Sequence, residues 1–280
     1  MFMTNVAELI NQDLTVAEVY LEQKKFDLVN IIGNRILQNL FIIDIKELMI
    51  IGLIVKEVSS DLQQINAAEH KADKKIDKCK PFAEDCFKTI KLTLSDEQPT
   101  IKIWNAYLDF EDKIREYLLV PEEREIYKDD DEFTTEATIN YLNILLLNKE
   151  YLLDKNIYPL ERTRAELATL TNTHGGRSTI LSYILSRAFE HVYRFALHAK
   201  VTDEELESIV STNINGLSEI VTLIQEGTEE ELIERANIMI GDLMYNYRKY
   251  FLLSGERGEI PLTPEVSQKI RKIIEKSKGK

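Results

Sequence analysis

The apolar residues of this chain recur every three to four positions over almost its whole length, which is the spacing of an α-helix. Glycine and proline are scarce, with 10 and 6 copies among 280 residues, and this disfavours a turn-rich all-β protein. Two capping boxes, Thr202 with Glu205 and Thr228 with Glu231, each precede a long apolar-periodic segment. The sequence therefore predicts an all-α fold, in which long helices with short connections form an antiparallel helical bundle.

Two local signals predict breaks between helices in the first half of the chain. Thr15 with Glu18 has the pattern of another capping box, so we expect one helix to end near Asn11 and the next to begin at Thr15. Pro81 follows a lysine-rich segment, and we expect the helix before it to stop there.

An acidic stretch of almost no apolar periodicity divides the chain into two halves. A run of this kind usually stays in solvent, and the hydrophobic content of 44% is ample for a core on either side. The predicted organisation is an N-terminal helical subdomain at 1–120, an acidic connector at 121–133, a C-terminal helical bundle at 134–256, and a C-terminal helix with a basic tail at 257–280.

Charge, cysteine usage and hydropathy limit the classes of function. The net charge of −13 argues against a surface devoted to nucleic acid, without excluding a local basic site. Cys79 and Cys86 make no disulfide framework, and with His70 they lack the short paired spacing of a zinc site. No signal peptide is visible, and the apolar run at 48–55 is far shorter than the ~20 residues that span a bilayer. We expect a cytoplasmic protein with two free thiols and no membrane segment, metal or cofactor.

The most distinctive helix is predicted at 177–200, RSTILSYILSRAFEHVYRFALHAK. Its apolar residues share one broad side. Its opposite side carries only arginine and histidine at spacings of 4, 3 and 4, so neighbours along it touch. We call this side the Arg/His ridge, and it consists of Arg187, His191, Arg194 and His198.

The Arg/His ridge admits two interpretations. In the first, its arginines pair with carboxylates on a neighbouring helix, since the chain has 48 acidic residues. In the second, the ridge receives an anion such as a phosphate, for which arginine offers a planar fork of donors and histidine a proton donor or acceptor. Just upstream, Gly175 and Gly176 precede the helix, and the uncovered amides of a helix start attract anions. The candidate binding residues are Arg187, His191, Arg194, His198, Arg177 and His174.

The segment VYLEQKKFDLVNIIGNRIL, at 19–37, has the pattern of a helical hairpin with a basic turn. It resembles the second-half pattern of tetratricopeptide repeats and also the opening hairpin of HEPN domains. The second resemblance implies a metal-independent ribonuclease, whose family pattern places four to six residues between an arginine and a histidine on a later helix. The nearest matches are Arg187 with His191 and Arg194 with His198, each with three intervening residues.

Three functional hypotheses follow. The first is a helical interaction or regulatory protein, a scaffold or adaptor without enzyme activity, which uses the Arg/His ridge to bind a protein partner or an anion; self-association stays open. The second is the HEPN-like ribonuclease, with His191 or His198 moving a proton. The third is a sequence-independent nucleic-acid binder that uses Lys71–Lys91 and the basic tail. The negative charge and the Arg–His spacing place the interaction protein first.

Overall fold

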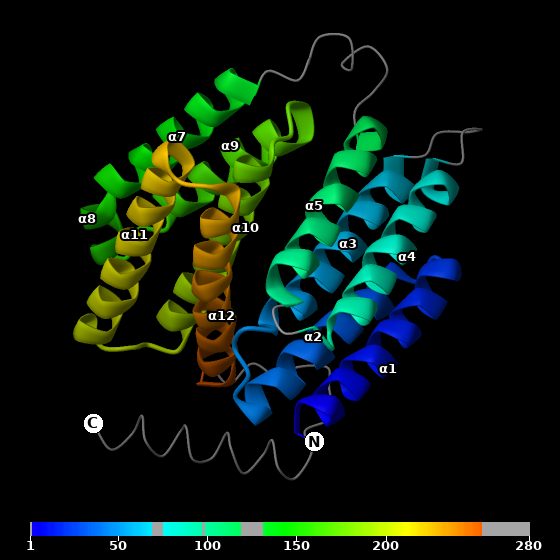
Figure 1. Ribbon diagram of the computed structural model, residues 1–280. Coiled ribbons are helices and arrows are strands. Elements are labelled where there is room, and N and C mark those ends of the chain that lie inside the picture. The colour runs from blue at the N-terminus through cyan, green and yellow to red at the C-terminus, as the bar shows by residue number, and fades with distance from the viewer. Residues whose placement is uncertain (1, 69–74, 97–98, 119–130, 254–280) are drawn as a thin grey trace.

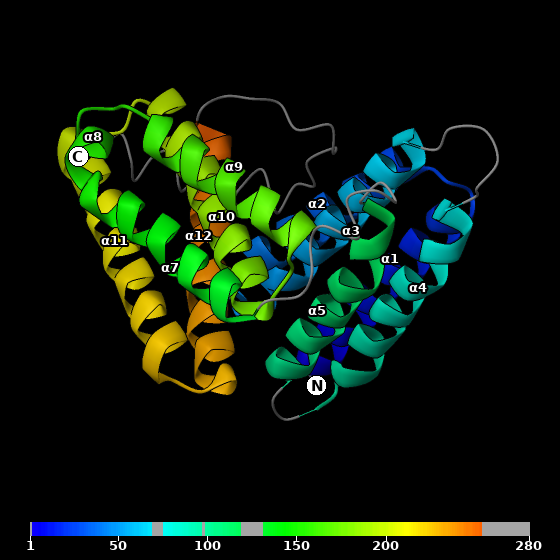
Figure 2. The ribbon, with the colours of Figure 1, turned by 90° about the horizontal axis from the view of Figure 1, so that it is seen from above.

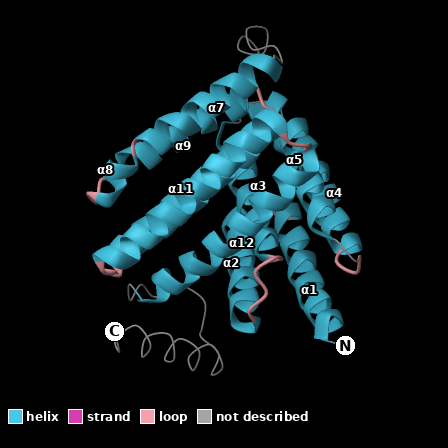
Figure 3. Ribbon diagram, turned by 60° about the vertical axis from the view of Figure 1, so that its left-hand side comes forward, coloured by secondary structure: helices cyan, strands magenta, loops and turns pink. Residues whose placement is uncertain are grey.

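The computed structural model describes residues 2–68, 75–96, 99–118 and 131–253. All regular structure in these ranges is helical, as Figure 3 shows, and the prediction of an all-α helical bundle is confirmed. The helices are α1 (Phe2–Glu22), α2 (Phe26–Ile43), α3 (Met49–Ala68), α4 (Lys75–Thr93), α5 (Pro99–Leu118), α7 (Asp131–Leu147), α8 (Lys149–Leu153), α9 (Tyr158–Thr173), α10 (Arg177–His198), α11 (Asp203–Glu226) and α12 (Glu229–Leu253).

The helices form two groups that pack against each other. Helices α1–α5 lie together on one side of the molecule and α7–α12 on the other, in the view of Figure 1 and again from above in Figure 2. Helix α10 packs on α7, α9, α11 and α12, so it is central to the second group. Helix α12 also contacts α2, α3 and α5 of the first group. Residues 121–130 of the predicted connector at 121–133 lie outside the described residues, and α7 begins at Asp131, within the predicted connector.

Both predicted breaks in the first half are wrong. The chain is one continuous helix from Phe2 to Glu22, and the Thr15 hydroxyl donates to the carbonyl of Asn11, one turn back, instead of capping a helix start. Helix α4 continues through Pro81. Cys79 and Ala83 on either side of that proline are fully buried, so packing outweighs the loss of one backbone hydrogen bond. Tertiary contacts here override the local signal.

The capping boxes predicted later in the chain are present. The Thr202 hydroxyl accepts from the Glu205 amide at 3.2 Å, and the Glu205 carboxylate accepts from the Thr202 amide at 3.2 Å. Thr228 and Glu231 make the same reciprocal pair at the start of α12. These caps satisfy amides that a helix start otherwise leaves unpaired. The predicted C-terminal helix and its basic tail lie outside the described residues.

Helices α2 and α3 approach each other at two glycines. A Cβ atom on Gly33 would lie 2.7 Å from the backbone oxygen of Gly52 and 2.6 Å from the Lys56 Cγ atom. A Cβ atom on Gly52 would lie 2.6 Å from the Leu37 Cγ atom. The close packing of this hairpin therefore requires hydrogen in place of a side chain at both positions.

Substitution of Gly33 by alanine is expected to lower the free energy of unfolding by about 1–3 kcal/mol, because the helices must move apart. Urea unfolding monitored by circular dichroism measures the effect. Gly216→Ala is the matched control, since the added methyl group there would meet the flexible end of Met239. That variant should be neutral or gain up to about 1 kcal/mol from helix propensity. Equal losses for both variants would contradict the explanation.

Polar contacts join the two groups along α12. The Trp104 indole nitrogen donates to the Asn237 side-chain oxygen at 3.3 Å, and the Asn237 amide donates to the Glu47 carbonyl at 3.3 Å. Lys46 forms an ion pair with Asp242 at 2.7 Å. Because Trp104 is fully buried and Asn237 is 6% exposed, these bonds fix the orientation of α12 against the first group.

None of the described helices combines the length and apolar content that crossing a bilayer would need.

Candidate functional site

The Arg/His ridge lies on a single uninterrupted helix, because α10 runs from Arg177 to His198. The apolar side of α10 is buried, while Arg187 and His191 are half-buried and Arg194 and His198 are exposed. The four side chains do not meet in one open site. The first two face α3 and α12 of the interface between the groups, and Arg194 turns toward α9.

Arg187 is paired across the interface. Its guanidinium donates to the carboxylate of Glu57 on α3, and to the Tyr183 hydroxyl at 3.1 Å. The Glu57 side chain is 3% exposed, so this carboxylate depends on Arg187 for its charge balance. The same contact raises the pKa of Arg187, mainly through the negative charge of Glu57. Burial raises the pKa of Tyr183 to about 12, so that hydroxyl stays protonated.

Two further carboxyl groups lie beside this pair, and with it they form the carboxyl cluster, Glu57, Asp61 and Glu111. Asp61 and Glu111 share a hydrogen bond, so one of them must carry a proton. The Tyr107 side chain lies beside Glu111 and acts to lower the pKa of that carboxyl group. Burial raises the pKa of Glu111 to about 7, and burial together with the neighbouring carboxylates raises the pKa of Asp61 well above its ordinary value. The Oε1 atom of Glu111 has no hydrogen-bond partner in the described part of the chain.

His191 lies next to this cluster in an environment that keeps its ring neutral. Burial lowers the pKa of His191 to about 4, and the charges of Lys56 and Arg187 act in the same direction. The pKa of Lys56 is itself lowered to about 8 by burial. The His191 ring packs edge-on against Tyr247 of α12, at 5.9 Å between centroids. At neutral pH this histidine is therefore uncharged and has no proton to give as an imidazolium.

Arg194 belongs to a second ion-pair network, between α9 and α10. It donates to Glu190 at 2.8 and 2.9 Å and to Glu161 at 2.5 Å. Arg164 donates to the other oxygen of Glu190 at 2.5 Å. Two arginines thus share the carboxylate of Glu190, which is only 5% exposed. His198 packs edge-on against the Phe195 ring at 6.1 Å.

The residues before α10 make an ordered connection. A Cβ atom on Gly175, where φ is +77°, would lie 1.3 Å from the Arg115 guanidinium. That guanidinium donates to the His174 carbonyl at 2.9 Å, so the glycine makes room for the bond. The His174 ring contacts Thr173 at 2.8 Å and lies 5.2 Å from the Phe133 ring.

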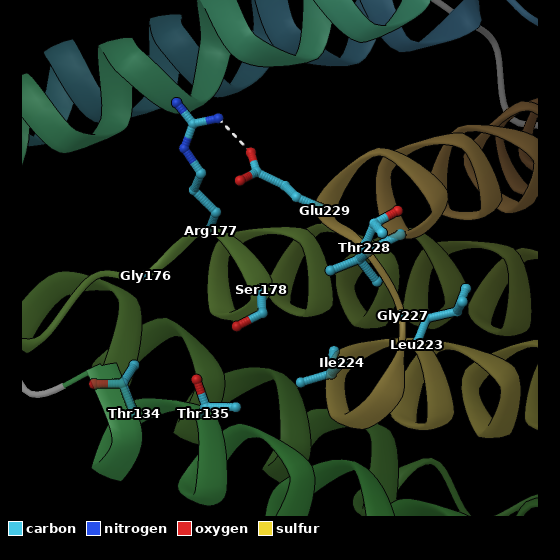
Figure 4. Close-up of a pocket in the computed structure, with 11 residues that line it drawn as sticks. Thr134, Thr135, Gly176, Arg177, Ser178, Leu223, Ile224, Gly227, Thr228 and Glu229 are labelled. Carbon is cyan, nitrogen blue, oxygen red and sulfur yellow. Dashed lines mark hydrogen bonds and ion pairs between the residues drawn. The ribbon is translucent and has the colours of Figure 1, made fainter.

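A pocket of about 320 Å³ lies where α7, α10 and α12 begin and α11 ends (Figure 4). Thr134, Thr135, Ser178 and Thr228 are among its lining residues. Arg177 points away from the two threonines of α7, toward Glu229. Its guanidinium donates to Glu229 at 2.5 Å, to Asp109 at 2.8 Å and to Asn105 at 2.8 Å. An anion here would compete with two carboxylates for the one arginine.

Two of the basic residues of α4, Lys80 and Lys91, are paired with acidic residues. Lys91 forms an ion pair with Glu18 at 2.6 Å, and Asp77 binds both Lys80, at 3.5 Å, and Lys24, at 3.0 Å. Cys79 and Cys86 are free and buried, and burial raises the pKa of Cys86. No three His, Cys, Asp or Glu side chains are placed to hold a metal ion in the described part of the chain. Residues 71–74 of the predicted basic segment Lys71–Lys91 lie outside the described residues.

A second candidate surface, which the sequence analysis did not single out, runs along α7 and α8. Its members are Phe133, Ala137, Asn140, Ile144, Leu147 and Tyr151, spaced 4, 3, 4, 3 and 4, and we call it the apolar stripe. Leu147 is 84% exposed, Tyr151 55% and Phe133 51%. The opposite side of α7 is the one buried against the second group, through Thr134, Thr138, Leu142 and Leu145. The sequence contains a signal for the stripe, because the α7 segment carries apolar residues on both sides of the helix and one helix side is enough for a core contact.

Comparison of the chain with models of protein families, with curated proteins and with solved structures found no match in any of the three.

Proposed function

We propose that this chain is a helical interaction protein that binds another protein through the apolar stripe of α7 and α8. The observation that carries the proposal is the exposure of large apolar side chains at helical spacing, with Leu147 at 84% and Tyr151 at 55%. Exposed apolar residues scattered singly need no explanation, but an aligned set along two successive helices is typical of a protein-binding surface. Such a set is the usual docking surface between helices.

In this proposal the Arg/His ridge stabilises the packing of neighbouring helices and does not bind the partner. Arg187 and Arg194 each bind carboxylates of neighbouring helices, so their charges are already matched. A ribonuclease would need arginine free to meet a phosphate and histidine able to exchange a proton near neutral pH. The low pKa of His191 and the paired arginines favour the interaction protein over the nuclease. The two buried free thiols fit a reducing compartment, so we propose that the protein works in the cytoplasm.

The test is a comparative capture experiment with the full chain. The tagged protein and its Leu147→Glu variant are incubated with lysate from cells that express the gene, and the bound proteins are quantified by mass spectrometry. The proposal expects at least one partner whose recovery falls about tenfold in the variant, as for the loss of one interface anchor. That partner should then bind the purified wild-type chain directly, and the variant more weakly.

Leu92→Glu is the matched control, because Leu92 is 70% exposed on α4 and does not belong to the apolar stripe. It should leave recovery of the partner unchanged. Identical sets of bound proteins for wild type and Leu147→Glu, or an equal loss with Leu92→Glu, would exclude the stripe as the binding surface.

A further inference from the structure

The apolar stripe has the dimensions of a helix-binding surface. From Phe133 to Leu147 it extends over 14 residues, which at 1.5 Å per residue is about 21 Å. The backbone donors and acceptors inside α7 are satisfied within the helix, so an extended peptide would find no free sheet edge to pair with. A partner helix, in contrast, can place its own apolar residues at 3- and 4-residue spacing against the stripe.

The margin of the stripe is acidic. Glu132, Glu136 and Glu150 are exposed, and each directly precedes a member of the stripe in sequence. On the other margin, Glu166 of α9 lies beside Tyr141, whose pKa is raised by burial and by the negative charge of Glu166. Among the cations near the stripe, Lys149 is half-buried, Lys155 lies 2.9 Å from Asp203, and Arg162 lies 4.0 Å from Glu166. The field at the stripe therefore favours positive charge on whatever covers it.

From these observations, and resting on the proposed function, we infer that the apolar stripe binds a basic amphipathic helix of a partner protein. That helix presents leucine, isoleucine or similar residues to Ile144 and Leu147, and lysine or arginine to Glu136 and Glu150. The polar Asn140 lies in the middle of the stripe, and a polar position within an apolar seam fixes the register of the two helices.

A second copy of this chain fits the surface less well. In an antiparallel pair of α7–α8 segments, Glu136 of one copy would lie near Glu150 of the other, and like charges so placed repel. The net charge of −13 on each chain adds to this repulsion. Charge complementarity thus selects a basic helix.

The experiment uses the full chain and two designed 18-residue helical peptides as probes. Both carry the same leucine stripe at 3- and 4-residue spacing; one is flanked by lysine and the other by glutamate. Fluorescence anisotropy at low salt measures binding. The lysine peptide should bind at least about tenfold more tightly than the glutamate peptide, and its affinity should fall as salt is raised. Leu147→Glu should weaken it by about tenfold or more.

Charge reversal at the margin distinguishes charge-selective binding from non-specific hydrophobic binding. Glu136→Lys should weaken binding of the lysine peptide and strengthen binding of the glutamate peptide. Glu8→Lys, at an exposed position of α1, should change the binding of neither peptide. Equal binding of the two peptides, or failure of both, would overturn the basic-helix inference. Self-association of the wild-type chain in analytical ultracentrifugation that Leu147→Glu abolishes would overturn it in favour of a second copy. If capture of a cellular partner is still reduced by Leu147→Glu, the proposed function stands even when one of these results overturns the basic-helix inference.

Discussion

Replacement of Arg187 by methionine is expected to lower the free energy of unfolding by about 3–5 kcal/mol, the cost of leaving a buried carboxylate without its partner. Glu57 loses its cation while its side chain stays 3% exposed, and the nearby Asp61 and Glu111 then face an uncompensated charge. Urea unfolding at pH 7, followed by circular dichroism, measures the change.

A double variant identifies the cause of that loss. Adding Glu57→Leu to Arg187→Met removes the stranded charge, so it should restore at least about 1–2 kcal/mol, a coupling typical of residues in direct contact. Arg194→Met is the matched control. Its side chain is 43% exposed and Arg164 still serves Glu190, so a change within about 1 kcal/mol is expected. If Arg187→Met cost no more than Arg194→Met, the contact with Glu57 would not be an important stabilising interaction.

The fold class was predictable because the helical period is a local property. Apolar spacing, scarce glycine and the capping boxes at Thr202 and Thr228 all act within one or two turns, and the structure has the helices and caps that they predict. The helix breaks predicted at Pro81 and Thr15 were wrong because the packing of neighbouring residues into the core keeps the helix continuous at both positions. Local patterns therefore predict elements well and their exact limits less well.

The partners of the ridge were not predictable in the same way. Glu57 and Arg187 are separated by 130 positions, and the sequence holds no signal that pairs one acidic residue among 48 with one arginine. A partial signal did exist for the carboxyl cluster. Glu111 lies at helical spacing from Trp104, Tyr107 and Ile114, all buried, so an acidic residue there interrupts an apolar face. The use of the Arg/His ridge as a binding surface stays a prediction.

Replacement of Glu111 by glutamine is expected to stabilise the protein, and increasingly so as the pH rises. The pKa of Glu111 is raised from 4.5 to about 7 in the folded protein because the carboxyl group is buried beside other acids. Between these values the unfolded chain releases the proton that the folded chain retains, so the wild-type free energy of unfolding falls as pH rises. Above pH 7 the full cost remains, on the order of 3 kcal/mol.

Glutamine keeps the shape and an acceptor oxygen for Tyr107 and Asp61 but cannot ionise, so the variant escapes this cost. Its advantage over wild type in urea unfolding should therefore be small at pH 5 and should grow to a few kcal/mol at pH 8. Glu207→Gln, the same substitution at an exposed position of α11, should leave the pH dependence unchanged. A Glu111→Gln advantage that did not vary with pH would mean that Glu111 is ionised in the folded protein throughout this range. The proton shared by Asp61 and Glu111 would then reside on Asp61, whose pKa is raised by burial and by the neighbouring carboxylates.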